Sequence, residues 1–222
     1  MCGRFELHSA LEIIAQVFAL GRTMMPLSPR YNIAPGQDVP IIVLEGRERE
    51  LVPSRWGFLP PWAMDEKDGY KMINARAETI AEKPSFRQAF CRHRCLVVAD
   101  GFYEWKKEGA KKTPVYVRLR SGKPFGFAGL YSDWRDPDGK SVRTSTIITT
   151  DANVLLAPVH DRMPVIVPPE KYGLWLDPEV HENDRLLPLL APFPDDQLEL
   201  YEVTPEVNSP KNDSKDNIQR IT

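Results

Sequence analysis

A succession of short β-type segments constrains the fold of this 222-residue chain more than any other feature. Five runs rich in apolar, β-branched and aromatic residues follow one another, at 94–100, 102–107, 113–120, 124–132 and 142–150. Turn signals at 108–109, 121–122 and 136–139 separate the later runs, which is typical of antiparallel strands with short connections. The 21 prolines favour turns and edge strands over a helical bundle.

The remaining pattern predicts a few helices beside this sheet. Further strands are expected at 39–44, 50–58 and 198–203, and helices at 10–20, 84–90, 152–156, 169–176 and 183–190. Ser9 and Glu12 have the spacing of a capping box for the first helix, and Gly21 follows its end. Residues 65–69 read as an exposed loop, and a polar tail begins at about 208.

Neither repeats nor an obvious linker divide the sequence. We therefore expect one α+β domain over residues 1–222, with a curled antiparallel or barrel-like sheet at its core. No apolar run approaches the length that spans a bilayer, and no signal peptide is evident. Three cysteines, an odd number, suit a reducing compartment, so we expect a cytoplasmic protein and a monomer.

The charge is unevenly distributed along the chain. The net charge of −2 argues against indiscriminate DNA binding. However, residues 1–120 hold 19 Lys and Arg against 14 Asp and Glu, whereas residues 121–222 hold 10 against 17. A basic N-terminal half can form a local groove for an anionic ligand on an otherwise neutral protein.

The second residue, Cys2, carries the most specific chemistry in the sequence. Small second residues usually become N-terminal when the initiator methionine is removed, which would place an α-amine beside the Cys2 thiol. A 1,2-aminothiol condenses with an aldehyde to an imine, and the thiol then closes a five-membered thiazolidine. The amine titrates near ~8 and a free thiol near ~8.5, so both nucleophiles are partly available at neutral pH.

Several stretches combine glycine, aromatic and ionisable residues in order along the chain. They read Met-Cys-Gly-Arg-Phe at 1–5, Tyr-Asn-Ile-Ala-Pro-Gly at 31–36, Arg-Trp-Gly-Phe at 55–58, Asn-Ala-Arg-Ala-Glu-Thr at 74–79, Cys-Leu-Val-Val-Ala-Asp-Gly-Phe-Tyr-Glu-Trp at 95–105 and His-Asp-Arg-Met-Pro at 160–164. A late Val-Thr-Pro-Glu-Val-Asn at 203–208 also fits. Together they resemble the SRAP family, the SOS response-associated peptidases that sense abasic sites in DNA.

The resemblance implies a covalent trap. The family is similar in using mature Cys2 to attack the ring-opened aldehyde of an abasic site in single-stranded DNA, which gives a thiazolidine crosslink. It implies the compact SRAP fold with a DNA groove across the site, and no cofactor. It also implies autocatalytic removal of Met1, and an imine intermediate would permit abasic-site lyase chemistry.

Four residues are candidates for the chemistry itself. Cys2 is the nucleophile, and Glu104 is placed to accept and return protons during imine formation. His160 titrates near ~6.5 and can move the proton that opens the closed sugar ring. Asn74 can hydrogen-bond the sugar hydroxyl or the Cys2 terminus.

Seven further residues are candidates for contacting DNA. They are Arg4, Arg76 and Arg162 for phosphates, Pro40, Trp62 and Trp105 for stacking or wedging against bases, and Thr149 as a hydroxyl donor. Arginine can hold a phosphate bidentately. Stacking on an aromatic ring is worth ~1–3 kcal/mol per base and tolerates any sequence, which suits a lesion sensor.

Other readings of these residues remain open at this stage. An N-terminal-nucleophile amidohydrolase or protease would share Cys2 and a base, but would need an oxyanion hole and a peptide cleft. A noncatalytic single-strand binding module would leave Cys2 incidental. Cys91, His93 and Cys95 supply three soft ligands where a structural zinc site usually has four, so we expect no metal.

Overall fold

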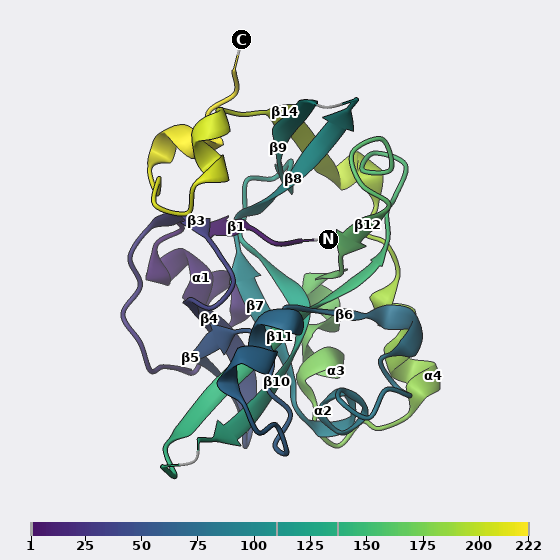
Figure 1. Cartoon of the computed structure of the whole chain (residues 1–222). Helices are drawn as coiled ribbons and strands as arrows, with labels where there is room; N and C mark the ends of the chain where they lie inside the picture. The colour runs from purple at the N-terminus through teal and green to yellow at the C-terminus, as the bar shows by residue number, and fades with distance from the viewer. Residues whose placement is uncertain (1, 110, 137, 222) are drawn as a thin grey trace.

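The protein has a mixed α+β fold, as the sequence predicts. The structure, a computed structural model, describes residues 2–109, 111–136 and 138–221. Antiparallel pairing predominates, and the helices are short and lie at the margins (Figure 1). Among the described residues, none of the helices has the length and apolar character needed to cross a membrane.

A closed ring of strands forms the centre of the molecule. The order β11-β10-β7-β4-β5 is completed by a parallel pairing of β5 back onto β11. These strands are β4 (Asp38–Glu45), β5 (Glu48–Trp56), β7 (Arg94–Ala99), β10 (Phe125–Arg135) and β11 (Ser141–Asp151). β7 is buried along its whole length, because the ring covers one face and helices cover the other. The barrel-like core expected from the sequence is thus confirmed.

Short strands extend this sheet around β11. β12 (Arg162–Pro164) pairs with β11 in antiparallel fashion, and β6 (Asn74–Arg76) pairs with it in parallel. This register sets Arg76 opposite Thr149 on β11. Two more short strands, β2 (Arg22–Thr23) and β13 (Ile166–Val167), pair with β5 and β10. The 74–79 and 160–164 motifs therefore lie on one region of the sheet.

A second sheet carries the N-terminal strand. Its order is β14-β9-β8-β1-β3, formed by β1 (Phe5–Leu7), β3 (Arg30–Ile33), β8 (Gly101–Glu108), β9 (Lys111–Leu119) and β14 (Leu198–Glu202). Phe5 lies opposite both Phe102 and Ile33. A Cβ atom at position 101 would lie 2.4 Å from the ring of Tyr116, so only glycine lets that ring cover the strand.

The helices pack on the outside of the two sheets. α1 (Leu11–Phe18) buries Ile14 and Phe18, and the Phe18 ring stacks on Tyr172 with centroids 5.1 Å apart. The other α-helices are α2 (Arg87–Arg92), α3 (Tyr172–Leu176) and α4 (Asn183–Leu186). The 3-10 helices are η1 (Glu66–Lys71), η2 (Ala77–Thr79), η3 (Pro169–Lys171), η4 (Leu187–Leu190), η5 (Asp195–Gln197), η6 (Pro205–Asn208) and η7 (Lys215–Ile218).

Three local predictions were wrong. Ser9 does not cap α1, whose N-cap is Ala10, because the Ser9 hydroxyl and backbone N–H both donate to Asp100, at 2.5 and 2.7 Å. Residues 152–156 form turns instead of a helix, and the expected loop at 65–69 is largely the 3-10 helix η1. In each case a local pattern was overridden by a side-chain partner or by a tighter turn.

The polar tail is bound to the second sheet. The buried Asn32 amide donates to three tail carbonyls, those of Val207, Ser209 and Asn212, at 3.2, 2.9 and 2.7 Å. Its carbonyl oxygen accepts from Nη1 of Arg4 at 2.7 Å. One amide therefore joins the N-terminal segment, β3 and the segment that runs through η6, shown in yellow at the upper left of Figure 1.

A single buried arginine joins the helices to the barrel. Arg94 begins β7, and its guanidinium donates to the carbonyls of five residues, namely Phe90, Cys91, Trp175, Asp177 and Val180. Burial lowers the pKa of Arg94. These hydrogen bonds satisfy the ends of α2 and α3, which otherwise would leave buried carbonyls without donors.

We expect Arg94→Ala to lower the free energy of unfolding by about 3 kcal/mol or more, since it leaves several buried carbonyls without a donor. Chemical denaturation monitored by tryptophan fluorescence measures this loss. Arg92→Ala is the matched control, because Arg92 is exposed two residues away and should change stability by less than about 0.5 kcal/mol. Equal effects of the two variants would contradict a clamping role for Arg94.

Candidate active site

The chain that leads into β1 places Cys2 inside the protein. Cys2 has no exposed surface, and Nδ2 of Asn74 donates to its backbone carbonyl at 2.9 Å. β1 lies between β8 and β3, so this segment enters between the second sheet and β6. Cys2 is therefore held by two segments that are remote in sequence. Met1 lies outside the described residues.

The environment of Cys2 keeps its thiol protonated. Burial raises the pKa of Cys2, and the negative charge of Glu104 raises it further, while the backbone N–H of Arg4 lowers it slightly. A thiol of this kind is a weak nucleophile by itself. Reaction at Cys2 thus requires a neighbouring group that can take the proton.

Glu104 is the carboxyl group that faces Cys2. It lies on β8, is 3% exposed, and has its pKa raised by burial and lowered by the positive charge of His160. Burial is the larger of the two effects, so the pKa of Glu104 is raised overall, and a carboxyl group that holds its proton more readily than usual suits a role in which it both accepts and returns a proton. The burial of Glu104 also favours this role over that of a solvated strand residue.

His160 lies at the end of the turns that follow β11. Its Nδ1 accepts a hydrogen bond from the backbone N–H of Arg162 at 2.9 Å. An imidazole nitrogen that accepts has no proton, so the neutral ring carries its proton on Nε2. Oδ1 of the exposed Asp161 lies 2.8 Å from the same Nδ1.

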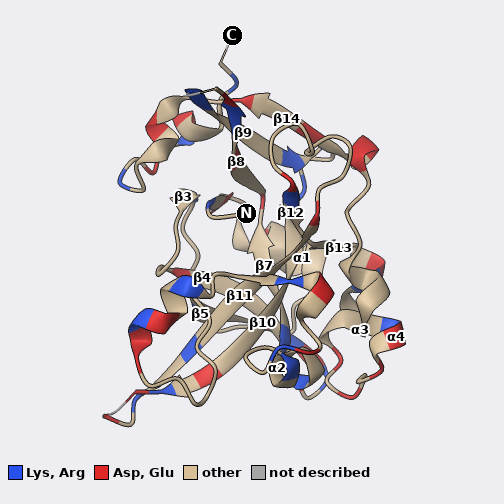
Figure 2. Cartoon of the chain, turned by 45° about the vertical axis from the view of Figure 1, so that its right-hand side comes forward, with Lys and Arg blue, Asp and Glu red and all other residues tan. Residues whose placement is uncertain are grey.

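An open groove joins these groups. It has a volume of about 470 Å³ and is lined by Glu104, Trp105, Lys107, Lys112, His160 and Asn208. The indole Nε1 of Trp105 donates to Oδ1 of Asn208 at 2.7 Å. Lysines lie at the free end of the β8–β9 hairpin, where Figure 2 shows blue ribbon, and two of them line this groove. The groove therefore offers an acid–base pair, an aromatic ring and two lysines to one ligand.

Asn74 and Arg76 lie on β6, which runs along β11. Oδ1 of Asn74 is buried and has no hydrogen-bond partner among the residues that the structure describes. A buried amide oxygen of this kind is available to a ligand hydroxyl or amine. Arg76 is exposed, so its guanidinium can reach a solvent-side phosphate. Both positions fit the roles expected from the sequence, and those roles stay predictions.

Two of the arginines that were expected to contact phosphates form hydrogen bonds within the protein. Arg162, with 11% of its side chain exposed, bonds Glu78 and Asp151, each at 2.7 Å. Nη1 of Arg4 donates to Asn32 and to the carbonyl of Val207, both at 2.7 Å. Nε of each arginine is buried and has no hydrogen-bond partner among the residues that the structure describes, and the expected phosphate roles of Arg162 and Arg4 stay predictions.

Two other expected DNA contacts are buried. Thr149 has no exposed surface, and its hydroxyl lies 3.5 Å from the Ala75 carbonyl between β6 and β11. Pro40 is buried within β4, opposite Pro53. Neither side chain presents a surface to a nucleotide, so these two predictions disagree with the structure.

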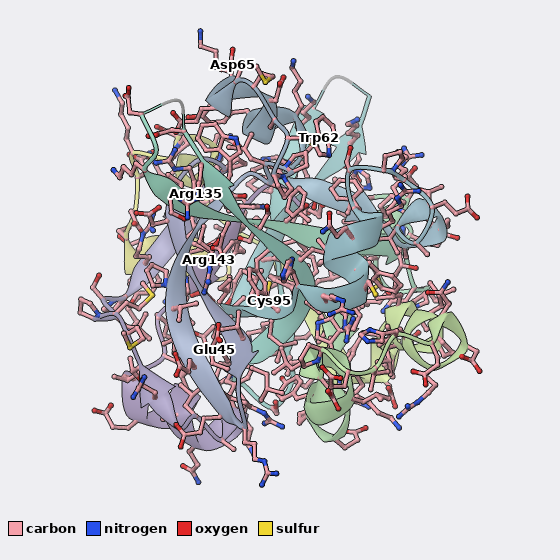
Figure 3. All side chains as sticks on the ribbon, turned by 90° about the horizontal axis from the view of Figure 1, so that it is seen from below. Glu45, Trp62, Asp65, Cys95, Arg135 and Arg143 are labelled. Atoms are coloured by element: carbon pink, nitrogen blue, oxygen red, sulfur yellow. The ribbon has the colours of Figure 1, made fainter. Side chains whose placement is uncertain are left out.

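The two candidate stacking residues lie in different places. Trp62 is 63% exposed on the segment between β5 and η1, near Asp65 (Figure 3). It lines a small hollow with Phe58 and Ser132, separate from the groove at Glu104. Trp105 lines that groove directly, and the Arg4 guanidinium lies 5.9 Å from its ring centroid. Trp105 is therefore the aromatic residue at the candidate site.

Sequence reasoning missed several residues around the groove. Asn208 and the two groove lysines were not singled out, although the 203–208 motif was noted. Pro35, in the noted stretch 31–36, is half-buried. Pro35 lies in the turn that follows β3. The motif pattern was the available signal for these residues.

The three residues considered as zinc ligands, Cys91, His93 and Cys95, lie in different surroundings. Cys95 is buried inside the barrel, as Figure 3 shows, whereas Sγ of Cys91 lies 3.4 Å from Nδ1 of His181. The His93 ring packs on Tyr131. This arrangement gives these residues separate structural roles.

A different trio, Glu6, His8 and Asp100, has ligand atoms within 4.8 Å of one another. Their oxygens already accept from neighbours: Glu6 from Tyr116 and Asp100 from the backbone of His8 and Ser9. Nδ1 of His8 lies 2.8 Å from Glu6. The trio is therefore a hydrogen-bond network within the second sheet.

Glu104→Gln should stabilise the protein at pH 7. The pKa of Glu104 is raised in the folded state, so above pH 4.5 the unfolded chain releases the proton more readily than the folded chain. As the pH rises above 4.5, ionisation of Glu104 therefore lowers the free energy of unfolding. Glutamine does not ionise, so the variant avoids this loss. Urea unfolding at pH 4 and pH 7 should show a gain for Glu104→Gln that appears only at the higher pH.

Glu108→Gln is the control for this measurement. Glu108 is an exposed residue on the same strand, and its pKa is lowered by its hydrogen bond to Lys106. Its removal should give no such gain at pH 7. A Glu104→Gln protein that is less stable at pH 7 than at pH 4, relative to wild type, would contradict the raised pKa.

Comparison with known proteins agrees with the order of the motifs. Residues 1–210 match the family model described as SOS response associated peptidase (SRAP). The chain is 47% identical over 222 residues to "Abasic site processing protein YoqW" of Bacillus subtilis, covering 99% of each chain. It is 30% identical to "Abasic site processing protein YedK" of Escherichia coli, covering 100% of both.

Solved structures show the same fold. A crystal structure of a Bacteroides thetaiotaomicron protein aligns with a TM-score of 0.81 at 31% identity, covering 97% of this chain and 92% of the other. One from Bordetella bronchiseptica aligns with a TM-score of 0.79 at 28% identity, covering 91% and 100%. The matched family model, the identity along the whole chain and the shared fold together place this protein in the SRAP family.

Proposed function

We propose that this protein senses abasic sites in single-stranded DNA and forms a covalent thiazolidine crosslink through Cys2 after Met1 has been removed. The printed names of its relatives from Bacillus subtilis, Escherichia coli and mouse all describe abasic site processing proteins. The observation that carries the proposal is the burial of Cys2 near Glu104, which lines a groove together with His160 and whose pKa the charge of His160 lowers. The crosslink would shield the lesion from strand cleavage.

The groups in the groove supply each proton transfer of this reaction. His160 moves the hydroxyl proton of the closed sugar to its ring oxygen, which frees the aldehyde. The Cys2 amine adds to the aldehyde carbon, and loss of one water gives the imine. The sulfur then adds to the imine carbon while the thiol proton passes to nitrogen, so the overall change is the loss of one water. Glu104 carries protons between these atoms.

The burial of Cys2 supports an ordered reaction. A thiol with a raised pKa does not react before the aldehyde arrives, which protects it from oxidation and from free aldehydes. Once the imine forms, its positive charge favours release of the thiol proton to Glu104. The same steps in reverse would release the DNA, and elimination from the imine would give lyase activity.

Removal of Met1 belongs to the same proposal. With Met1 in place, the nitrogen of Cys2 is an amide and cannot form an imine. Self-cleavage by the Cys2 thiol, with Glu104 as base, is the activity that the peptidase name of the family suggests. We further propose that the protein acts as a monomer in the cytoplasm, bound to DNA without a cofactor.

Incubation with a single-stranded oligonucleotide that carries one abasic site tests the proposal. We expect an adduct of protein minus Met1 plus DNA minus water by intact mass spectrometry. Cys2→Ala should abolish the adduct and keep noncovalent binding, whereas Cys2→Ser should keep only an imine that borohydride traps. A form that retains Met1 should not react, and full crosslinking by that form would contradict the mechanism.

The other outcomes separate the alternatives. Tight binding without an adduct would indicate a noncatalytic single-strand binding module. Absence of both, together with cleavage of an added peptide, would indicate an N-terminal-nucleophile amidohydrolase.

Arg76→Ala should weaken binding of single-stranded DNA and leave the chemistry intact. Arg76 is exposed on β6, so its removal should cost one phosphate contact and lower the slope of log K against log salt by about 0.7. Fluorescence anisotropy at several salt concentrations measures this slope. Arg22→Ala is the control, because Arg22 is equally exposed but lies beside β5 and pairs with Glu50. An unchanged slope with slower crosslinking at saturation would contradict a phosphate role.

A further inference from the structure

Two lysines face each other across the hairpin that borders the groove. Lys107 on β8 lies directly opposite Lys112 on β9, and both side chains line the groove with Trp105. Like charges at directly opposed positions of an antiparallel pair destabilise the sheet. Such an arrangement is favoured where a negatively charged ligand lies over both residues.

The other face of the same hairpin is neutralised. Lys106 and Lys111 lie there because side chains alternate along a strand, and Glu108 lies between them. Nζ of Lys106 lies 2.6 Å from Oε1 of Glu108. By contrast, within the described part of the chain no carboxylate forms an ion pair with Lys107 or Lys112. The hairpin thus keeps its unneutralised charge on the groove side.

The position of this pair relative to the chemistry is set by β8. Glu104, Trp105, Lys107 and Lys112 all line the groove, and Trp105 shares a strand face with Lys107, two residues further along. Along β8 the groove therefore presents first the carboxyl group of Glu104, then the ring of Trp105 and then the ammonium group of Lys107.

We propose that Lys107 and Lys112 form a phosphodiester subsite for nucleotides on one flank of the reacting residue. The inference rests on the proposed function, since it assumes that a DNA strand occupies the groove. One phosphate or two successive phosphates lie over the lysine pair, and the intervening base meets the Trp105 ring. The subsite therefore reads the backbone on a single side of the lesion and is indifferent to base sequence.

The double variant Lys107→Gln/Lys112→Gln tests the subsite against the charge-matched variant Lys106→Gln/Lys111→Gln. Both remove two positive charges from one exposed hairpin. Anisotropy with an undamaged single-stranded oligonucleotide should show affinity reduced roughly tenfold at low salt for the first variant, with a salt slope lower by about 1.4. The second variant should keep the wild-type slope. Equal losses in both variants, or no loss in either, would overturn the subsite.

A second measurement locates the flank. Oligonucleotides with the abasic site at the 5′ end or at the 3′ end offer nucleotides on only one side. The Lys107→Gln/Lys112→Gln variant should lose crosslinking efficiency with one of these two substrates at subsaturating DNA, and regain the full rate at saturation. An equal loss with both substrates would contradict a one-sided subsite.

The result that would disprove the proposed function differs from the result that would disprove the subsite. If the wild-type protein forms no adduct with any abasic oligonucleotide, the crosslinking proposal fails. If the wild type crosslinks and both double variants behave alike, the crosslinking proposal stands and the subsite fails. Aggregation of the Lys107→Gln/Lys112→Gln variant with unchanged DNA binding would show that the lysines only protect the open edge of β8 from pairing, which also overturns the subsite.

Discussion

The insertion of β1 between β8 and β3 is the interaction on which the candidate site depends. The strand has only three residues, yet Phe5 pairs on both sides and the Arg4 carbonyl accepts from the backbone N–H of Tyr103 at 2.9 Å. A chain end is ordinarily mobile, because few contacts restrain it. Here the pairing of β1 fixes the backbone that carries Cys2, and Asn74 completes the restraint from β6.

Electrostatics at the site follow from this placement. A carboxyl group and a thiol are buried near one another; burial raises the pKa of both, and the charge of Glu104 raises that of Cys2 further. A positive charge on His160 opposes the rise at Glu104. A site in which ionised side chains lower the stability of the fold suits a reaction that moves one proton among a few groups. The free energy of unfolding that is lost when Glu104 ionises is the counterpart of its role in that reaction.

The sequence was sufficient to predict the sheet and the family, but not the partners of individual side chains. Period-two patterns between 94 and 150 correspond to real strands, because alternation and turns are local properties. Ser9 was misread because its partner Asp100 is 91 residues away. The ion pair of Arg162 was not foreseen for the same reason, since Glu78 lies 84 residues away. A motif identifies the type of side chain, whereas its partners depend on the fold.

The segment around η6 gives the site an order of assembly. Arg4 donates to the carbonyl of Val207, which is 203 residues further along the chain, and the same carbonyl accepts from Asn32. Contacts between such distant residues form late, after the intervening chain exists. The Cys2 segment is therefore enclosed only when residues near 207 have folded back onto β3. Loss of this C-terminal segment would remove a restraint on the N-terminal segment, although the two are far apart in sequence.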